Sequence, residues 1–135
     1  MPPPLVVSDT HALIWYAQGR TQKLGPAARR VFERCASGQA AVYVPALVLA
    51  ELSEAARCGR VALPGGFLFW TAQLFASGRF VPVGLTWEIL RRAESLYAIP
   101  ERGDRLIAAT AAQLDAPLLT RDPEIGAAAG VEVIW

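Results

Sequence analysis

Short apolar runs that suit buried strands alternate along the whole chain with longer segments that suit helices. Strands are expected at residues 5–7, 41–44, 80–83, 118–120 and 131–135. Helices are expected at residues 10–18, 26–37, 47–58, 67–76, 87–98 and 104–114. Parallel neighbours in a sheet need a crossover connection, so this alternation is typical of a parallel sheet covered by helices. The sequence therefore predicts a three-layer α/β/α sandwich with a central, mainly parallel sheet of about five strands.

Composition narrows the class of protein. The chain has 135 residues, which suits one domain over residues 1–135. Within that domain, Pro82 predicts an edge or irregular position for the third strand. Apolar residues make up 53% and charged residues 19%, which excludes a disordered chain and suggests surfaces that a partner covers. The formal net charge of +1 excludes a basic field over the whole molecule, so any contact with nucleic acid must use local patches.

Cysteine usage and the start of the chain bear on location. Cys35 and Cys58 are the only cysteines, and neither belongs to a Cys/His cluster, so a zinc site is not expected. The opening Met-Pro-Pro-Pro lacks the features of a signal peptide, and no apolar run is long enough to cross a membrane. These features favour a cytoplasmic protein without membrane contact.

Four acidic residues follow the predicted strands in a regular way. Asp9 and Asp122 come directly after the first and fourth strands. Glu51 lies in the helix that follows the second strand, and Asp104 lies at the start of the sixth helix. Because the carboxyl ends of parallel strands meet at one edge of a sheet, the four carboxylates are expected to converge on one crevice.

Such a group of carboxylates has a specific chemical meaning. Carboxylates in one pocket repel each other and raise each other's pKa unless a cation is present. Oxygen ligands without His or Cys select Mg²⁺ or Mn²⁺. A divalent ion held there activates water and stabilises charge on a phosphodiester. The pattern predicts a metal-dependent hydrolase acting on phosphodiesters.

Each acidic residue also has a purely structural explanation. Asp9 and Asp104 suit helix N-caps, and Asp122 before a proline suits a plain turn. Glu51 suits a solvated helix position that pairs with Arg57 or Arg105. The structural explanation is the stronger one for each residue alone, but the convergence of all four favours a site.

Five segments, in order and spacing, resemble a known family. They are Ser8-Asp9-Thr10-His11-Ala12-Leu13-Ile14-Trp15, Ala50-Glu51-Leu52, Asp104-Arg105-Leu106-Ile107-Ala108-Ala109-Thr110-Ala111, Leu119-Thr120-Arg121-Asp122-Pro123 and Val133-Ile134-Trp135. Together they resemble PIN-domain ribonucleases, and in particular the VapC-type toxins of bacterial toxin–antitoxin pairs. Where many relatives carry a His and an Asp upstream of the sixth helix, this chain has Glu101 and no His.

The resemblance implies a PIN fold and an Mg²⁺- or Mn²⁺-dependent endoribonuclease acting on structured RNA of the tRNA or rRNA class. It also implies a homodimer and a small VapB-like antitoxin that covers the active site. Carried over residue by residue, Asp9, Glu51, Asp104 and Asp122 become the catalytic, metal-binding residues. Thr120 becomes a residue that supports the site by hydrogen bonding.

Residues beside the acidic positions suit supporting roles. Thr10 is placed to bind phosphate or a water molecule, and equally to cap a helix. Arg105 and Arg121 adjoin Asp104 and Asp122, so they are placed either to bind RNA phosphate or to neutralise the acidic group. His11 is the only histidine, and we expect a structural or exposed position for it.

Aromatic residues are dense over 67–76, where a core helix is the default and a groove for an antitoxin helix or a dimer contact is the alternative. Two other functions stay open at this point. One is a housekeeping RNA-processing PIN nuclease, and the other is a non-catalytic module that binds Mg²⁺ or a partner. A receiver-like version of the latter is disfavoured because Lys23 is the only lysine and the third strand offers no Asp.

Overall fold

The central element of the molecule is a parallel sheet, seen in a computed structural model that describes residues 5–135. The described residues form five strands: β1 (Leu5–Ser8), β2 (Ala41–Pro45), β3 (Phe80–Val83), β4 (Leu118–Leu119) and β5 (Val133–Ile134). Their order across the sheet is β3-β2-β1-β4-β5, and every pair of neighbours is parallel. The opening Met-Pro-Pro-Pro, which we expect not to be a signal peptide, lies outside the described residues.

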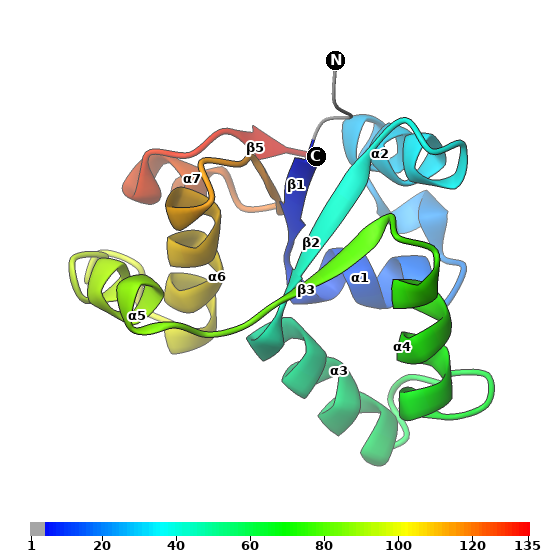
Figure 1. Cartoon of the computed structure of the whole chain (residues 1–135). Helices are drawn as coiled ribbons and strands as arrows, with labels where there is room; N and C mark the ends of the chain where they lie inside the picture. The colour runs from blue at the N-terminus through cyan, green and yellow to red at the C-terminus, as the bar shows by residue number, and fades with distance from the viewer. Residues whose placement is uncertain (1–4) are drawn as a thin grey trace.

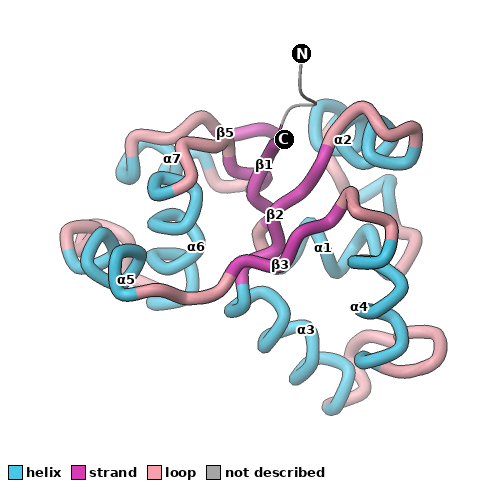
Figure 2. The backbone as a smooth tube through the Cα atoms, viewed as in Figure 1, coloured by secondary structure: helices cyan, strands magenta, loops and turns pink. Residues whose placement is uncertain are grey.

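Helices cover both faces of this sheet. Within the described residues they are α1 (Thr10–Ala17), α2 (Pro26–Ala36), α3 (Ala46–Arg57), α4 (Phe67–Ala76), α5 (Trp87–Glu94), α6 (Arg102–Gln113), α7 (Pro123–Ala129) and a 3₁₀ turn at Thr21–Lys23. Figure 1 shows α1, α2 and α4 on one side of the sheet and α5, α6 and α7 on the other. Figure 2 shows the strands lying between these two groups. The predicted α/β/α sandwich is confirmed.

The strands are apolar because both faces of the sheet are buried. Val7 of β1, Val42 of β2 and Leu119 of β4 are completely buried. Leu13 anchors α1 on this core, and Leu52 anchors α3. These anchors fix the two helices beside the predicted site, because Asp9 directly precedes α1 and Glu51 lies in the second turn of α3.

Most predicted boundaries agree with the structure within two residues, and the differences have local causes. Pro82 lies in β3, which is the edge strand, as predicted. The sequence reading missed α7 and expected a plain turn there, but Asp122 caps this helix and Pro123 occupies its first position. The expected N-cap role of Asp104 is wrong, because α6 begins earlier and Glu101 is its N-cap. In the described part of the chain, no helix is long and apolar enough to cross a membrane.

Candidate active site

The order in which the chain adds strands to the sheet reverses between β1 and β4, and the acidic residues lie at this point. From β1 the chain builds outward through β2 and β3, then crosses back to place β4 on the other side of β1. Ser8 lies opposite Leu119, and the Asp9 backbone N–H donates to the Leu119 carbonyl over 3.1 Å. Ligand sites in open parallel sheets form at such a switch point, outside the carboxyl ends of the strands.

A cavity of about 210 Å³ lies at this point. Five carboxylates line it: Asp9, Glu51, Glu101, Asp104 and Asp122. They come from the ends of β1 and β4, from α3 and from the start of α6. The structure therefore brings the four predicted acidic residues to one cavity, which we call the acidic pocket, and adds Glu101.

Asp9 has a structural and an electrostatic role at once. Its Oδ1 accepts a hydrogen bond of 2.8 Å from the Ala12 backbone N–H, so it caps α1. Burial raises the pKa of its carboxyl, and the Ala12 N–H and the Thr120 side chain oppose that shift. The predicted capping role is thus correct, and the Thr120 side chain stabilises the same carboxylate from the β4 side.

Thr120 and Asp122 form the β4 side of the pocket. Thr120 is buried, and its Oγ1 accepts a 3.3 Å hydrogen bond from the Asp122 backbone N–H. The Asp122 Oδ1 accepts a 3.0 Å hydrogen bond from the Glu124 N–H at the start of α7. These two contacts fix the turn after β4 and hold Asp122 beside the end of β1.

Glu51 and Asp104 face the pocket from α3 and α6. Burial raises the pKa of both carboxyls. The charge of Glu101 adds to the rise for both, and Asp104 also feels the charges of Asp9, Asp122 and Glu51. The other four carboxylates of the pocket therefore all raise the pKa of Asp104.

Gly103 allows two of these side chains to approach the start of α6. A Cβ atom at this position would lie 3.2 Å from Glu51 Oε1 and 3.5 Å from Glu101 Oε1. The first of these distances is shorter than ordinary van der Waals contact, so a larger side chain would displace Glu51. Because Gly103 has no side chain, the Glu51 and Glu101 carboxylates can lie near Asp104.

The donor set fits a hard divalent cation in its chemistry. All five acidic groups offer oxygen, and three of them carry pKa values raised by burial, which a bound cation would lower again. The buried Thr10 Oγ1 also has no hydrogen-bond partner among the described residues, although it approaches Glu51. No three His, Cys, Asp or Glu side chains of residues 5–135 are close enough to hold an ion as they stand. The carboxylates would have to rotate inward around it.

The two predicted arginines lie in different surroundings. Arg121 lines the acidic pocket, and its guanidinium lies over the Trp15 ring, 5.5 Å from the centroid. Arg105 instead donates to the carbonyls of Ile99 and Pro100, at 2.8 and 2.9 Å. It does not line the pocket, so the structure gives no support to the phosphate contact predicted for Arg105.

The pocket also has an aromatic wall that the sequence reading did not assign to the site. His11, Trp15 and Trp135 line it, and the Trp15 ring lies 5.7 Å from each of the other two rings. Trp15 and Trp135 lie near opposite ends of the chain, so no local sequence pattern indicates that they line one pocket. Glu101 had a weak signal, since it stands where many relatives have an acidic residue.

The sequence matches the PIN domain family over residues 6–131, so the chain belongs to that family. Similar solved structures include VapBC2 from Rickettsia felis bound to a DNA fragment from its promoter, with a TM-score of 0.70 and 14% identity over 96% of each chain. FitAcB from Neisseria gonorrhoeae has a TM-score of 0.62 and 18% identity over 95% of each chain. A toxin–antitoxin complex from Klebsiella pneumoniae has a TM-score of 0.59 and 18% identity over 90% of each chain. At such low identity these similarities establish the fold, and no curated protein sequence matches the chain significantly.

Proposed function

We propose that this protein, taken as one PIN domain over residues 1–135, is a metal-dependent endoribonuclease and the toxin of a VapBC-type toxin–antitoxin pair. PIN domains are generally nucleases. The observation that carries the proposal is the acidic pocket, where carboxylates from four parts of the chain meet at the switch point of a PIN fold. The substrate class we propose is structured RNA, tRNA or rRNA, cut in the cytoplasm.

The residues of the pocket divide the work. Asp9, Glu51, Asp104 and Asp122 are the side chains to hold Mg²⁺ or Mn²⁺, with Glu101 beside them. When bound, the ion supplies charge neutralisation at the phosphate and lowers the pKa of the attacking water. Thr120 holds the turn that carries Asp122.

Arg121 is the cation of the pocket that suits a phosphate oxygen. Its contact with the Trp15 ring holds the guanidinium beside the carboxylates without a bidentate ion pair to any of them in the described residues. A guanidinium held in this way keeps its hydrogen-bond donors available for the substrate.

The first experiment is cleavage of total RNA by the purified protein with Mg²⁺ or Mn²⁺. We expect discrete cuts that disappear with EDTA and in Asp104→Asn, and that persist in Glu132→Gln, which removes an exposed carboxylate outside the pocket. Cutting by both Asp9→Asn and Asp104→Asn would refute the site. Cutting without growth arrest on overexpression would favour a housekeeping nuclease instead of a toxin.

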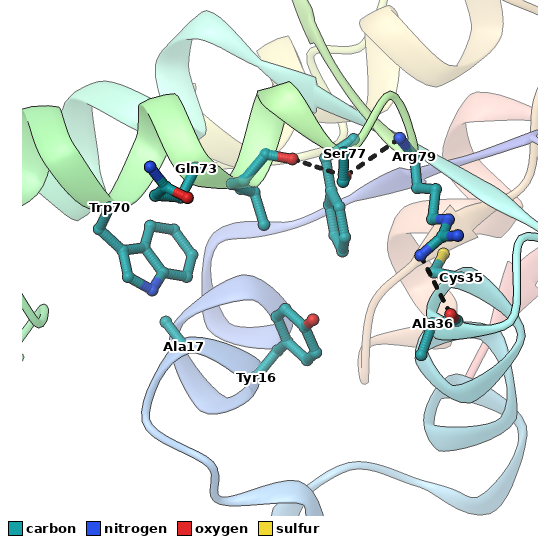
Figure 3. A pocket seen from close by; sticks show the side chains of 10 residues that line it. Tyr16, Ala17, Cys35, Ala36, Trp70, Gln73, Ser77 and Arg79 are labelled. Atoms are coloured by element: carbon teal, nitrogen blue, oxygen red, sulfur yellow. Dashed lines mark hydrogen bonds between the residues drawn. The ribbon is translucent and has the colours of Figure 1, made fainter.

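An antitoxin is the partner we propose, because the similar structures are toxin–antitoxin complexes. A cavity of about 440 Å³ between α1, α2, α4 and β3 suits part of such a partner. Figure 3 shows Trp70 and Gln73 of α4 facing Tyr16 and Ala17 of α1 across it. Elsewhere on α4, Leu68 is 80% exposed and does not line this cavity, and we propose that it adds an apolar contact to the same partner. The small gene next to this one should give a protein whose binding is lost in Leu68→Asp.

A homodimer is the assembly we propose, and the β3–α5 region is its contact. Leu85, Trp87 and Leu90 are exposed there, with Trp87 at 70%. Sedimentation or light scattering should give a dimer for the wild type and a monomer for Trp87→Ser with Leu90→Ser. A dimer in both proteins would place the contact elsewhere.

A further inference from the structure

A second cavity adjoins the acidic pocket. Its volume is about 520 Å³, and it shares Thr10, His11 and Glu51 with that pocket. From there it continues to Arg20 and Arg60. We call this cavity the α1–α3 groove, because it lies along these two helices.

Helix geometry fixes the direction of the groove. His11, Ile14 and Gln18 line it from α1 and its C-cap, at a spacing that puts them on one face of the helix. Seven residues of helix span about 10 Å. The groove therefore runs from the pocket, at the start of α1, to the far end of the helix.

The far end of the groove is structurally tied together. The Gln18 side chain donates a 3.3 Å hydrogen bond to the Arg60 carbonyl, which links the end of α1 to the segment after α3. The Arg60 backbone N–H donates to the Ala55 carbonyl over 2.9 Å. Arg60 is thus held at the end of the groove by its backbone, while its side chain stays exposed.

The guanidinium groups of Arg20 and Arg60 are not paired with another residue of the described chain. Arg20 and Arg60 are exposed, and their guanidinium groups make no hydrogen bond or ion pair with another residue of the described chain. The Arg105 guanidinium, by contrast, donates hydrogen bonds to two backbone carbonyls. Glu54 also lines the groove, and one of its oxygens accepts from the Cys58 thiol.

The charge distribution points to a polyanion. Five carboxylates make the acidic pocket repulsive to phosphate, so affinity for a nucleic-acid strand beyond the Arg121 contact has to come from cations just outside it. With a net charge of +1, the chain offers no general attraction to replace such contacts. The α1–α3 groove supplies two arginines at the end of the cavity that leaves the pocket.

From this we infer that the α1–α3 groove binds the single-stranded RNA that flanks the cut site, with Arg20 and Arg60 contacting backbone phosphates about 10 Å from the pocket. The inference rests on the proposed nuclease function and adds the path of the strand. It places His11 and Ile14 under the nucleotides between the cut and the arginines.

The test measures binding separately from cleavage. Fluorescence anisotropy of a labelled 12-nucleotide single-stranded RNA of random sequence, in EDTA, gives the Kd over a range of salt concentrations. Each phosphate contact on a single strand adds about 0.7 to the slope of log affinity against log salt, so Arg20→Gln with Arg60→Gln should lower the slope by about 1.4. If the two proteins bind equally at 1 M salt, the same relation gives a Kd weakened about 25-fold at 0.1 M salt.

Matched variants complete the experiment. Arg30→Gln with Arg34→Gln removes two exposed arginines of α2 that line no described cavity, and it should leave Kd and slope unchanged. Arg20→Lys with Arg60→Lys should restore most of the slope, because phosphate contact needs the charge. Thermal melting confirms that each variant is folded.

The outcomes separate the two proposals. A normal slope in the Arg20→Gln, Arg60→Gln protein, with RNA cleavage intact, overturns the groove and leaves the nuclease standing. An equal loss in the α2 control also overturns it, because total charge would then explain the effect. Loss of antitoxin binding with normal RNA binding overturns it in favour of a protein site. A wild type that neither binds nor cuts RNA overturns the nuclease and the groove together.

Discussion

The substitution Asp104→Asn tests the electrostatics of the acidic pocket without relying on catalysis. Burial and four neighbouring carboxylates raise the pKa of Asp104 above its ordinary value. The ionised carboxyl therefore opposes folding at neutral pH, because the folded state binds this proton more tightly than the unfolded state. An asparagine of the same shape removes that cost, so we expect the metal-free variant to be more stable than the wild type.

The size of the effect follows from the size of the pocket. In water, two charges about 7 Å apart, the diameter of a sphere of 210 Å³, repel by about 0.6 kcal/mol. Screening at physiological salt lowers this to about 0.25 kcal/mol per pair. Four pairs give about 1 kcal/mol, which corresponds to a rise in Tm of about 3 to 5 °C.

Thermal unfolding in EDTA and then with Mg²⁺ measures both arms of this prediction. The advantage of Asp104→Asn should be complete at pH 7, shrink as the pH falls through the raised pKa of the folded state, and vanish below pH 3.8, where the wild-type carboxyl is protonated in both states. Mg²⁺ should stabilise the wild type more than the variant, since binding to the folded state adds to stability. Glu132→Gln, outside the pocket, serves as the control.

A variant less stable than the wild type in EDTA at pH 7 would refute the reasoning. It would mean that the Asp104 carboxylate is stabilised by contacts rather than strained by its neighbours. An advantage that persists unchanged at pH 4 would refute it as well, because charge repulsion would then not be its cause.

Three further predictions concern individual residues. Asp9→Asn keeps the α1 cap and should abolish RNA cleavage without lowering the Tm, whereas Asp9→Ala should cost about 1 kcal/mol relative to Asp9→Asn in urea unfolding, and equal stability of the two would contradict the cap. Gly126→Ala should cost about 1–3 kcal/mol by calorimetry, because its Cβ would overlap Val133 of β5, and an unchanged Tm would show that α7 can move. Burial raises the pKa of the Cys35 thiol to about 11, so at pH 8 iodoacetamide should modify exposed Cys58 and spare Cys35. Peptide mass mapping measures this, and reaction at both cysteines would contradict the packing of α2.

Much of the fold could be predicted from local sequence pattern. Runs such as 41–44 and 118–119 are continuously apolar because both faces of a parallel strand are buried. Pro82 marked the edge strand because it cannot donate to a neighbour. The helix α7 was missed, since seven residues rich in alanine carry little periodicity, although Asp122 and Pro123 form a helix start.

The site was predictable only as a set of positions. Asp9 and Asp122 follow strands, so the rule for parallel sheets placed both at one edge. The pattern gave no means to separate Arg105 from Arg121, which both adjoin an acidic residue. In the structure Arg105 turns back to the loop before α6, and Arg121 turns toward Trp15. The roles of the carboxylates in metal binding stay a prediction.

The amino-acid sequence by itself determined the alternation of strands and helices and the acidic residues that follow the strands, because burial and capping act on neighbouring residues. Only the tertiary structure decided that β4 lies beside β1, that Glu101 joins the acidic pocket, and that a groove leads from it to Arg20 and Arg60. Strand order and side-chain direction depend on contacts between residues far apart in the chain. Local periodicity carries no information about such contacts.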